Sequence, residues 1–201
     1  MTPRPRVLVL GGSLADPSHT AALMRALERA LAVGGAATCR WDIAQRPLPP
    51  LRPGVEADPV DPARRALLAA ADAADALVIV TPLYHASFSG DVKQALDHLS
   101  PRQLAGKPVA LASNSGGASG AQAVDHLRAV VRALHAVAIP QQVVTVDAHY
   151  VLVGDQYRLA DSDALARVRA LGEHLLWFAG RLHRDAAAAE TQAQPTAVAA
   201  K

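Results

Sequence analysis

Short apolar runs alternate with segments of helical periodicity along this chain of 201 residues. This alternation predicts parallel strands joined by helical, right-handed crossovers. The run Ala76-Leu77-Val78-Ile79-Val80 is uncharged and branched, which is typical of a strand buried on both faces. Strands are predicted at 6–10, 38–43, 76–80, 108–112 and 142–146, and helices at 21–32, 63–74, 92–99, 121–137 and 161–183. The pattern predicts an α/β fold, a three-layer α/β/α sandwich around a five-stranded parallel sheet.

Composition and length favour one globular domain. Apolar residues make up 51% of the chain and charged residues 19%, which suits a single full core. We expect this domain to span 1–184 and the segment 185–201, rich in Ala, Gln and Thr, to be a disordered tail. The segment 44–62 contains six prolines and predicts a long connection without helix or strand, typical of a lid, a partner-binding arm or a flexible excursion. Residues 147–159 are expected to be irregular or hairpin-like.

The charge balance and the single cysteine exclude several classes of protein. A formal net charge of +2 argues against binding to nucleic acid or to a membrane surface. Cys39 is the only cysteine, so neither an intramolecular disulfide nor a cysteine metal cluster is expected. The eight histidines have no metal-ligand spacing, and no nucleophilic triad motif is present, so we predict no metal ligands and no catalytic acid or base. Without a secretory segment or a membrane span, a cytoplasmic protein is expected.

The segment after the first predicted strand has the composition of a phosphate-binding loop. It reads Gly-Gly-Ser-Leu-Ala-Asp-Pro-Ser-His-Thr from Gly11 and leads into a helix, whose first N–H groups are unpaired. Ser13, Ser18 and Thr20 add hydroxyl donors suited to a terminal phosphate, and a protonated His19 adds a charge-assisted bond. Neither a Walker lysine nor the G-x-G-x-x-G of a dinucleotide fold is present. The alternative is that Ser18 and Thr20 only cap the helix.

Two further polar segments follow neighbouring predicted strands. The decapeptide 81–90, Thr-Pro-Leu-Tyr-His-Ala-Ser-Phe-Ser-Gly, offers the flat rings of Tyr84 and His85 and the hydroxyl of Ser87. The segment 114–120 is small and glycine-rich, and its amides can meet the carbonyl edge of a flat heterocycle, although an ordinary strand-to-helix turn remains the alternative. The carboxyl ends of central parallel strands share one sheet edge, where ligands bind. The three segments therefore favour the strand order 2-1-3-4-5 and a mononucleotide with a flat ring system.

Together these motifs resemble the NAD(P)H-dependent FMN reductase family of flavodoxin-like proteins. The resemblance covers about 6–184 and includes Lys93 and Leu96-Asp97 after the decapeptide. It is closer to the reductases that supply reduced FMN to alkanesulfonate and methanesulfonate monooxygenases. The resemblance implies FMN as cofactor, NADH or NADPH as co-substrate and a flavin-dependent monooxygenase as partner. The residues it implies in FMN binding are Ser13, Ser18, His19 and Thr20 for the phosphate, Pro82, Leu83, Tyr84, His85 and Ser87 for the ring, and Asn114, Ser115, Gly116 and Gly117 for its pyrimidine edge.

Other features of the resemblance concern affinity and assembly. Many family members have Arg where this chain has Ala15, and the loss of that cation suits a flavin that is released. Helix 121–137 is apolar over more than one stripe, which predicts a homodimer or homotetramer through this helix. His126 falls where the sulfonate-system reductase has an aromatic residue at a π-type bulge. Lys93 and Asp97 are expected to pair along the surface of their helix.

The sequence leaves several functions open. A related reductase would keep FMN bound and reduce a quinone, an azo dye or a metal oxyanion. A flavodoxin-type electron carrier is disfavoured by the small positive net charge, and a mononucleotide-binding module without redox activity is the third alternative. The choice between NADH and NADPH is also open, because the candidate arginines for a 2'-phosphate, Arg46, Arg52, Arg64 and Arg65, have no deciding spacing.

Overall fold

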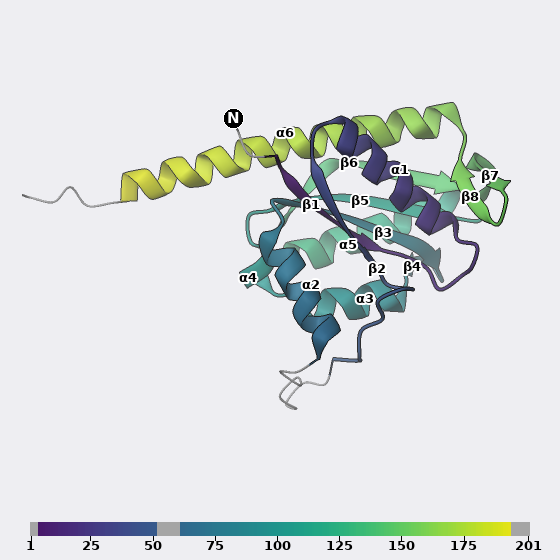
Figure 1. Cartoon of the computed structure of the whole chain (residues 1–201), viewed down its shortest axis with the longest axis horizontal. Helices are drawn as coiled ribbons and strands as arrows, with labels where there is room; N and C mark the ends of the chain where they lie inside the picture. The colour runs from purple at the N-terminus through teal and green to yellow at the C-terminus, as the bar shows by residue number, and fades with distance from the viewer. Residues whose placement is uncertain (1–3, 52–60, 194–201) are drawn as a thin grey trace, which may run out of the picture.

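A computed structural model describes residues 4–51 and 61–193 of the chain. Five parallel strands lie in the order β2-β1-β3-β5-β6, and the short strand β4 pairs antiparallel with β3. The strands are β1 Arg6–Gly11, β2 Ala37–Asp42, β3 Ala76–Tyr84, β4 Ser87–Phe88, β5 Pro108–Ser115 and β6 Val137–Val146. Counted among the parallel strands alone, this order is 2-1-3-4-5. The predicted α/β/α sandwich and strand order are confirmed (Figure 1).

Helices α1, α2, α3 and α6 begin at side chains that satisfy one of their first N–H groups. The Ser18 hydroxyl accepts from Ala21 N at the start of α1, and the Ser89 hydroxyl caps α3 in the same way. The helices are α1 His19–Val33, α2 Pro62–Ala73, α3 Gly90–Asp97, α4 Pro101–Leu104, α5 Ala121–Ala133 and α6 Ser162–Ala193, with 3-10 turns η1 Ala118–Gly120 and η2 Asp147–His149. No helix in the described parts of the chain is both long and apolar enough to cross a membrane.

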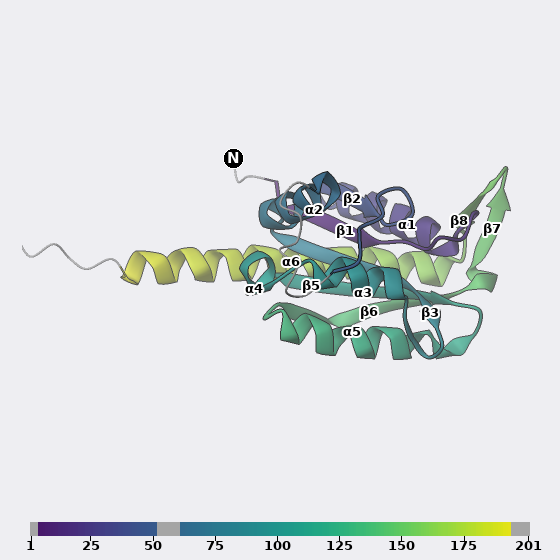
Figure 2. The ribbon, with the colours of Figure 1, turned by 90° about the horizontal axis from the view of Figure 1, so that it is seen from below.

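Alternate residues of each strand face opposite helical layers, as the two-residue period of a strand requires. Val7 and Val9 of β1 pack with α1 and α6, whereas Leu8 and Leu10 pack with α2, α3 and α5. In Figure 2, α1 and α5 accordingly lie on opposite sides of the sheet. Burial on both faces explains why the central strands carry uninterrupted apolar runs.

The decapeptide 81–90, predicted as a loop, is instead largely a β-hairpin. β3 continues to Tyr84, and the antiparallel pairs are Leu83 with Phe88 and Tyr84 with Ser87. His85 and Ala86 form the turn with φ of 48° and 65°, the left-handed conformation that a two-residue hairpin turn requires at both positions. The sequence did not show this because the turn contains neither glycine nor asparagine, the usual hairpin residues.

The boundary between α5 and β6 was also predicted wrongly. α5 ends at Ala133 instead of at residue 137. Just after this end, His135 takes a φ of 58° and the chain reverses. β6 begins at Val137 instead of residue 142, and its register with β5 shifts between Val109 and Leu111. The Arg128 guanidinium donates to the carbonyl oxygens of Ile139 at 2.9 Å and Pro140 at 3.0 Å within this irregular stretch. An arginine from the neighbouring helix thus satisfies the carbonyls that the strand ladder leaves unpaired.

Apolar residues of α5 serve the chain's own core. Val124, Leu127 and Val131 are buried against the sheet, and Val130 and Leu134 pack on the same core cluster. The apolar stripe of Val124, Leu127 and Val131 is therefore used within the chain, whereas Val130 and Leu134 stay partly exposed.

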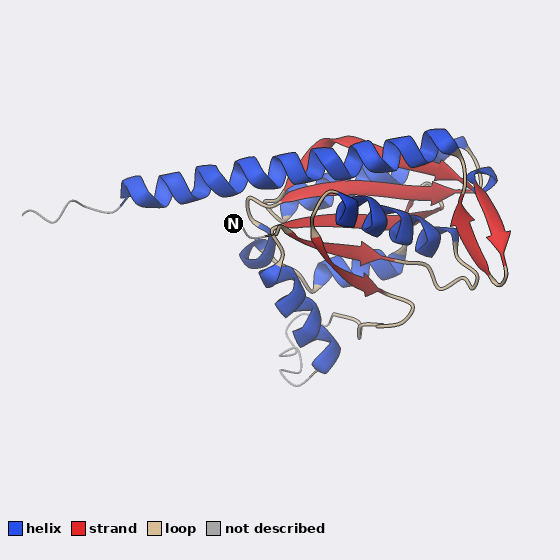
Figure 3. Cartoon of the chain, turned by 45° about the horizontal axis from the view of Figure 1, so that its top comes forward, coloured by secondary structure: helices blue, strands red, loops and turns tan. Residues whose placement is uncertain are grey.

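Three other predicted segments can be compared with the structure: the hairpin, the last helix with its tail, and the proline-rich connection. The predicted hairpin within 147–159 is present as β7 Tyr150–Val153 and β8 Gln156–Leu159, at the end of the sheet toward which the parallel strands point (Figure 3). α6 continues to Ala193 and extends beyond the body of the molecule in Figure 1, so the predicted helix end at 183 is wrong. Of the predicted tail, 185–193 is helical and 194–201 lies outside the described residues. In the predicted connection 44–62, residues 52–60 also lie outside them.

Candidate functional site

The carboxyl ends of β1, β3 and β5 lie side by side and bring the three predicted segments together. In the sheet register Gly11 is opposite Val80, and Pro82 is opposite Asn114. The segments that follow these residues therefore start at neighbouring points of one sheet edge. This is the edge at which open α/β sheets bind ligands.

The first segment begins with close packing against the strands beside it. A Cβ on Gly12 would lie 2.8 Å from Asp42 Oδ1, and Gly12 has a φ of +130° that side chains rarely tolerate. Ser13 Oγ accepts a hydrogen bond from Ala15 N at 3.2 Å, and Ser18 Oγ accepts one from Ala21 N at 3.1 Å. The capping role considered for Ser18 is thus present.

Several donors of this segment remain available to a ligand. Among the described residues, the backbone amides of Ser13, Leu14 and Asp16 have no hydrogen-bond acceptor. They lie beside the amino end of α1, whose partial positive charge favours an anion. Thr20 is almost fully buried, at 2% exposure. The loop amides and the partly buried Ser18 hydroxyl are therefore more accessible donors than the hydroxyls of Ser13, at 8% exposure, and Thr20.

His19 is held by groups from the far end of the chain. Its Nδ1 lies 3.1 Å from Asp147 Oδ1, and its ring stacks on Tyr157 with 3.7 Å between ring centroids. Tyr150 packs on it at a tilt, 4.9 Å between centroids. The imidazole is thus fixed in position beside the first turn of α1.

The second segment presents its rings at the surface. Pro82 is buried and Leu83 is partly buried, whereas Tyr84 and His85 are exposed at the end of the hairpin. The Tyr84 hydroxyl lies 3.2 Å from Ser13 Oγ, which links the hairpin to the first segment. The Ser87 hydroxyl lies 3.0 Å from Nδ1 of His126 on α5.

His126 itself lies in an uninterrupted α-helix. α5 runs as a regular α-helix from Ala121 to Ala133, so the π-type bulge expected near His126 is absent from this described helix. Its observed contact is the hydrogen bond to Ser87. His126 therefore braces the β3–β4 hairpin from the neighbouring helix.

The third segment combines an anchored side chain with an open backbone. Asn114 Nδ2 donates to Asp147 Oδ1 at 2.8 Å, and Asn114 Oδ1 accepts from Thr145 Oγ1 at 2.9 Å. Ser115 is buried, and its hydroxyl donates to the Gly117 carbonyl. A Cβ built on Gly117 would meet no atom within 4 Å, and Gly116 is exposed as well. The backbone of this turn is thus open to a flat ligand.

A buried polar network joins the third segment to the β7–β8 hairpin. The Tyr150 hydroxyl lies 2.8 Å from Thr145 Oγ1, which also lies 3.2 Å from the Ser113 carbonyl oxygen. Burial raises the pKa of the Tyr150 phenol well above its ordinary value, so this group stays protonated near neutral pH. Asp147 contacts His19 of the first segment and Asn114 of the third, so its carboxylate connects these two segments.

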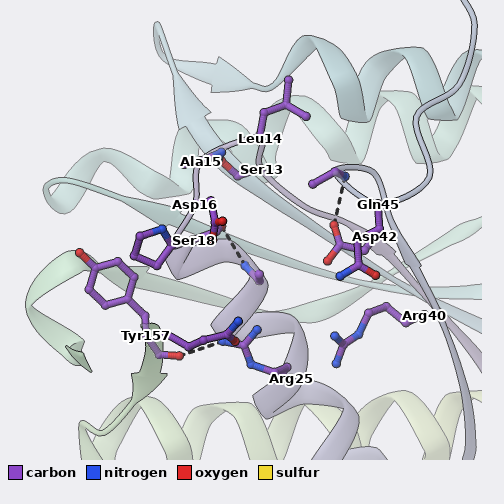
Figure 4. Close-up of a pocket in the computed structure, with 14 residues that line it drawn as sticks. Ser13, Leu14, Ala15, Asp16, Ser18, Arg25, Arg40, Asp42, Gln45 and Tyr157 are labelled. Atoms are coloured by element: carbon purple, nitrogen blue, oxygen red, sulfur yellow. Dashed lines mark hydrogen bonds between the residues drawn. The ribbon is translucent and has the colours of Figure 1, made fainter. Parts of the chain in front are cut away.

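A cavity of about 560 Å³ lies beside the first segment, toward β2 (Figure 4). Loop residues 13–18 form one wall, α1 and β8 contribute Arg25 and Tyr157, and β2 contributes Arg40 and Asp42. Its volume is within the range of small-molecule sites. This polar cavity was not predicted, because Arg25 and Arg40 belong to no motif.

The residues present fit FMN. Unpaired loop amides, two serine hydroxyls and the amino end of α1 suit a phosphate monoester. The exposed Tyr84 and His85 rings suit one face of an isoalloxazine, and the open backbone at Gly116 and Gly117 suits its polar edge. One cation of the common pattern is missing at Ala15.

Other candidates from the sequence lie elsewhere. Lys93 Nζ lies 2.6 Å from Asp97 Oδ1, so their predicted pairing along α3 is confirmed. The arginines considered for a 2'-phosphate do not line the cavity: Arg46 lies over the Trp41 ring, Arg64 and Arg65 belong to α2, and Arg52 lies outside the described residues. Within the described ranges no group of three or more His, Cys, Asp or Glu side chains could hold a metal ion.

The sequence prediction missed Asp147, Tyr150 and Tyr157. They lie more than a hundred residues after the phosphate-binding loop and match no motif. One signal was available: Asp147 directly follows a predicted strand, so it had to lie at the same sheet edge as the three segments.

The strand order and the flanking helices define a flavodoxin-like α/β protein. Solved structures with this fold include the flavoenzyme NAD(P)H:(acceptor) oxidoreductase FerB from Paracoccus denitrificans, with a TM-score of 0.72 and 22% identity over 88% of this chain and 98% of that chain. An NADH:FMN oxidoreductase in its apo form gives a TM-score of 0.69 and 23% identity over 85% of this chain and 88% of that chain. At such identities the likeness concerns the fold alone.

Sequence comparison identifies the family. The model of the NADPH-dependent FMN reductase family matches residues 5–150, and the chain belongs to this family. An FMN-dependent NADPH-azoreductase of Staphylococcus aureus is 36% identical over 177 residues, covering 85% of this chain and 93% of that protein. The family resemblance is thus confirmed, and the predicted pair of FMN and NAD(P)H is the pair that this family uses. The narrower resemblance to sulfonate-system reductases stays a prediction.

Proposed function

We propose that this protein binds FMN at the three converging segments and uses NAD(P)H to reduce an azo compound or a quinone. One observation carries the proposal: side chains link the phosphate loop to both other segments. Ser13 contacts Tyr84 at 3.2 Å, and Asp147 contacts both His19 and Asn114, at 3.1 and 2.8 Å. A phosphate site, an aromatic wall and an amide-lined edge are therefore held in fixed relation.

FMN, when bound, supplies the chemistry of hydride acceptance, so the protein needs no acid or base triad. The chain's task is positioning. The amides of Ser13, Leu14 and Asp16 and the Ser18 hydroxyl would bind the phosphate. Tyr84 and His85 cover one side of the ring, and the amides of 115–117 stabilise negative charge at its edge. Leaving the other side open lets the nicotinamide, and then the second substrate, approach to roughly 3 to 3.5 Å.

The choice of acceptor rests on the azoreductase relative, at 36% identity over most of both chains. The proposed function is therefore the predicted alternative in which the reductase keeps FMN bound and reduces a quinone or an azo dye.

The test is steady-state turnover of purified protein saturated with FMN. NADPH or NADH is the donor, and an azo dye or a benzoquinone is the acceptor. The proposal predicts acceptor-dependent oxidation of the nicotinamide, and FMN that stays with the protein through gel filtration. No oxidation with any of these acceptors would overturn it.

A second candidate is the release of reduced FMN to a flavin-dependent monooxygenase, including one that acts on sulfonates. Ala15 favours it, because the loop lacks the cation that would hold the phosphate tightly. Free FMN would then behave as a second substrate in a ping-pong pattern, and the flavin would be lost on gel filtration. The two candidates thus predict opposite results in gel filtration, and only the second predicts that free FMN behaves as a substrate.

Homodimer or homotetramer formation through α5 belongs to the same proposal. The exposed Arg132 and Asp125 and the partly buried Val130 would contribute to such a surface. Light scattering on the FMN-loaded protein tests it, and a monomeric mass at micromolar concentration would contradict it.

A further inference from the structure

The outer side of α6 carries an aromatic patch that the candidate FMN site does not use. Trp177 is 54% exposed, although aromatic residues make up only 3% of the chain. Its ring packs edge-on against Phe178, with 4.9 Å between ring centroids, and the Arg181 guanidinium lies over it, 5.0 Å from the ring centroid. An ordered tryptophan at the surface is typical of the centre of a protein interface.

A hollow of about 550 Å³ lies beside this ring. It is lined by residues of α6 and of the irregular stretch of β6, namely Pro140, Gln141, Glu173, His174, Trp177 and Phe178. The Gln141 Oε1 atom is buried and has no hydrogen-bond partner in the described parts of the chain. An indole ring carries one N–H donor and no acceptor, so a second tryptophan that enters the hollow can donate to this oxygen. The hollow therefore suits an aromatic ring that carries a donor.

The charges around Trp177 are arranged so that a second copy of this chain complements them. Glu173 lies four residues before Trp177 and Arg181 four residues after it, so all three share one ridge of α6. A two-fold axis close to Trp177 pairs two such helices antiparallel, which places Glu173 opposite the partner's Arg181 and Arg181 opposite the partner's Glu173. Neither residue forms an ion pair within the described part of the chain. The patch is thus self-complementary in charge.

The position of Trp177 along its helix agrees with this pairing. Trp177 lies midway along α6 (Ser162–Ala193), whose last turns extend beyond the body of the molecule (Figure 1). Gly180, one turn after Trp177, is exposed, and a Cβ built on it would meet no atom within 4 Å. A glycine inside a helix is destabilising relative to alanine, and here it leaves room for the backbone of a second helix to approach closely.

We propose that the surface formed by α6 and the irregular stretch of β6 binds a second copy of this chain, with the Trp177 side chain of each copy in the hollow of the other. Glu173 and Arg181 form two symmetric ion pairs across this interface. Because the contact is isologous, it closes as a dimer. It is separate from the α5 surface considered above, since α5 and α6 pack on opposite faces of the sheet. A chain that used both surfaces would assemble as a tetramer.

The first test is the molar mass of the full chain, measured by light scattering at micromolar concentration. The wild type should have the mass of a dimer, or of a tetramer if α5 also associates. Trp177→Ala should halve that mass. Leu152→Ala is the matched control, because it truncates an exposed apolar side chain on the β7–β8 hairpin, and it should leave the mass unchanged.

Charge reversal tests the proposed arrangement directly. Glu173→Arg and Arg181→Glu should each raise the dissociation constant of the dimer about tenfold, because each places like charges opposite one another at two points. The double variant that combines these two substitutions should recover most of the affinity, because both pairs form again with reversed signs. Arg167→Glu changes an exposed residue of the same helix that does not line the hollow, and should change the dissociation constant less than about twofold.

Tryptophan fluorescence gives an independent measurement. The chain has two tryptophans and Trp41 is only 1% exposed, so emission that changes with protein concentration reports on Trp177. The emission maximum should shift to longer wavelength on dilution, as the ring becomes exposed to water. A monomeric wild type, an unchanged mass in Trp177→Ala, or a double variant as dissociated as the single variants would overturn the inference.

Discussion

Gly12 lies in the phosphate loop, and its replacement by alanine has a cost that the structure allows to be worked out. In Gly12→Ala the new Cβ would lie 2.8 Å from Asp42 Oδ1 and 3.2 Å from Ile43 N. The Asp42 carboxylate cannot simply move away, because its Oδ1 accepts from Ala44 N at 3.1 Å. The φ of +130° adds backbone strain for any residue with a side chain.

The steric clash and the backbone strain together determine the expected loss of folding stability. Overpacking a closed site costs about 1 to 3 kcal/mol, and a backbone held in a sparsely populated region costs a similar amount. We take about 3 kcal/mol as the sum, which lowers the melting temperature of a domain of this size by about 6 to 12 °C. Because the clash displaces the loop amides, FMN affinity should fall at least about tenfold, the equivalent of 1.4 kcal/mol.

Gly154→Ala is the matched control for backbone strain. Gly154 has a φ of +64° in the β7–β8 turn, and its Cβ would meet no atom within 4 Å. It should lose only about 1 kcal/mol, or about 2 to 4 °C, and bind FMN as the wild type does. The assays are thermal unfolding of the flavin-free proteins and flavin fluorescence titration. Equal melting temperatures for the two variants would show that the Asp42 clash adds no cost, and unchanged FMN affinity in Gly12→Ala would show that the loop amides do not bind FMN.

Three further predictions concern other contacts of the site and the sheet. Tyr84→Phe removes the 3.2 Å contact with Ser13 and should weaken FMN binding about 2- to 10-fold in a fluorescence titration, with little change in melting temperature. Arg128→Lys keeps the charge but loses the fork that caps two β6 carbonyls, so the melting temperature should fall by about 4 to 8 °C, and an unchanged value would contradict that role. Burial raises the pKa of the Tyr150 phenol above its value in the unfolded chain. The contribution of Tyr150 to stability is therefore complete below about pH 10 and decreases at higher pH, where the phenol ionises in the unfolded chain but not in the folded one. The melting temperature of Tyr150→Phe should accordingly fall less between about pH 9 and pH 11 than that of the wild type.

The sequence predicted the sheet because its central strands are locally unambiguous. The run 76–80 is buried on both faces, and the three polar segments follow strands that are neighbours in the sheet. The same logic brought Ser13, Tyr84 and Asn114 to one edge, where the structure places them. At these positions the structure that the local sequence pattern predicts is also the one that the tertiary contacts stabilise.

The errors occur where tertiary contacts override local preference. β6 starts early because Arg128 satisfies carbonyls around a proline that would otherwise interrupt a strand. The 85–86 turn adopts a left-handed backbone without glycine because antiparallel pairs and the neighbouring α5 hold it. The contacts of His19 with Asp147 and Tyr157 span most of the chain, so no local pattern could contain them.

Three loop segments at the carboxyl edge of the sheet are proposed to form one FMN site that accepts hydride from NAD(P)H. Titration of the flavin-free protein with FMN, followed by flavin fluorescence and then by addition of NADPH, tests it most directly. The expected result is saturation at one FMN per chain and oxidation of NADPH that rises in parallel with FMN occupancy. Unchanged flavin fluorescence at every protein concentration, or NADPH oxidation that does not depend on FMN occupancy, would contradict it.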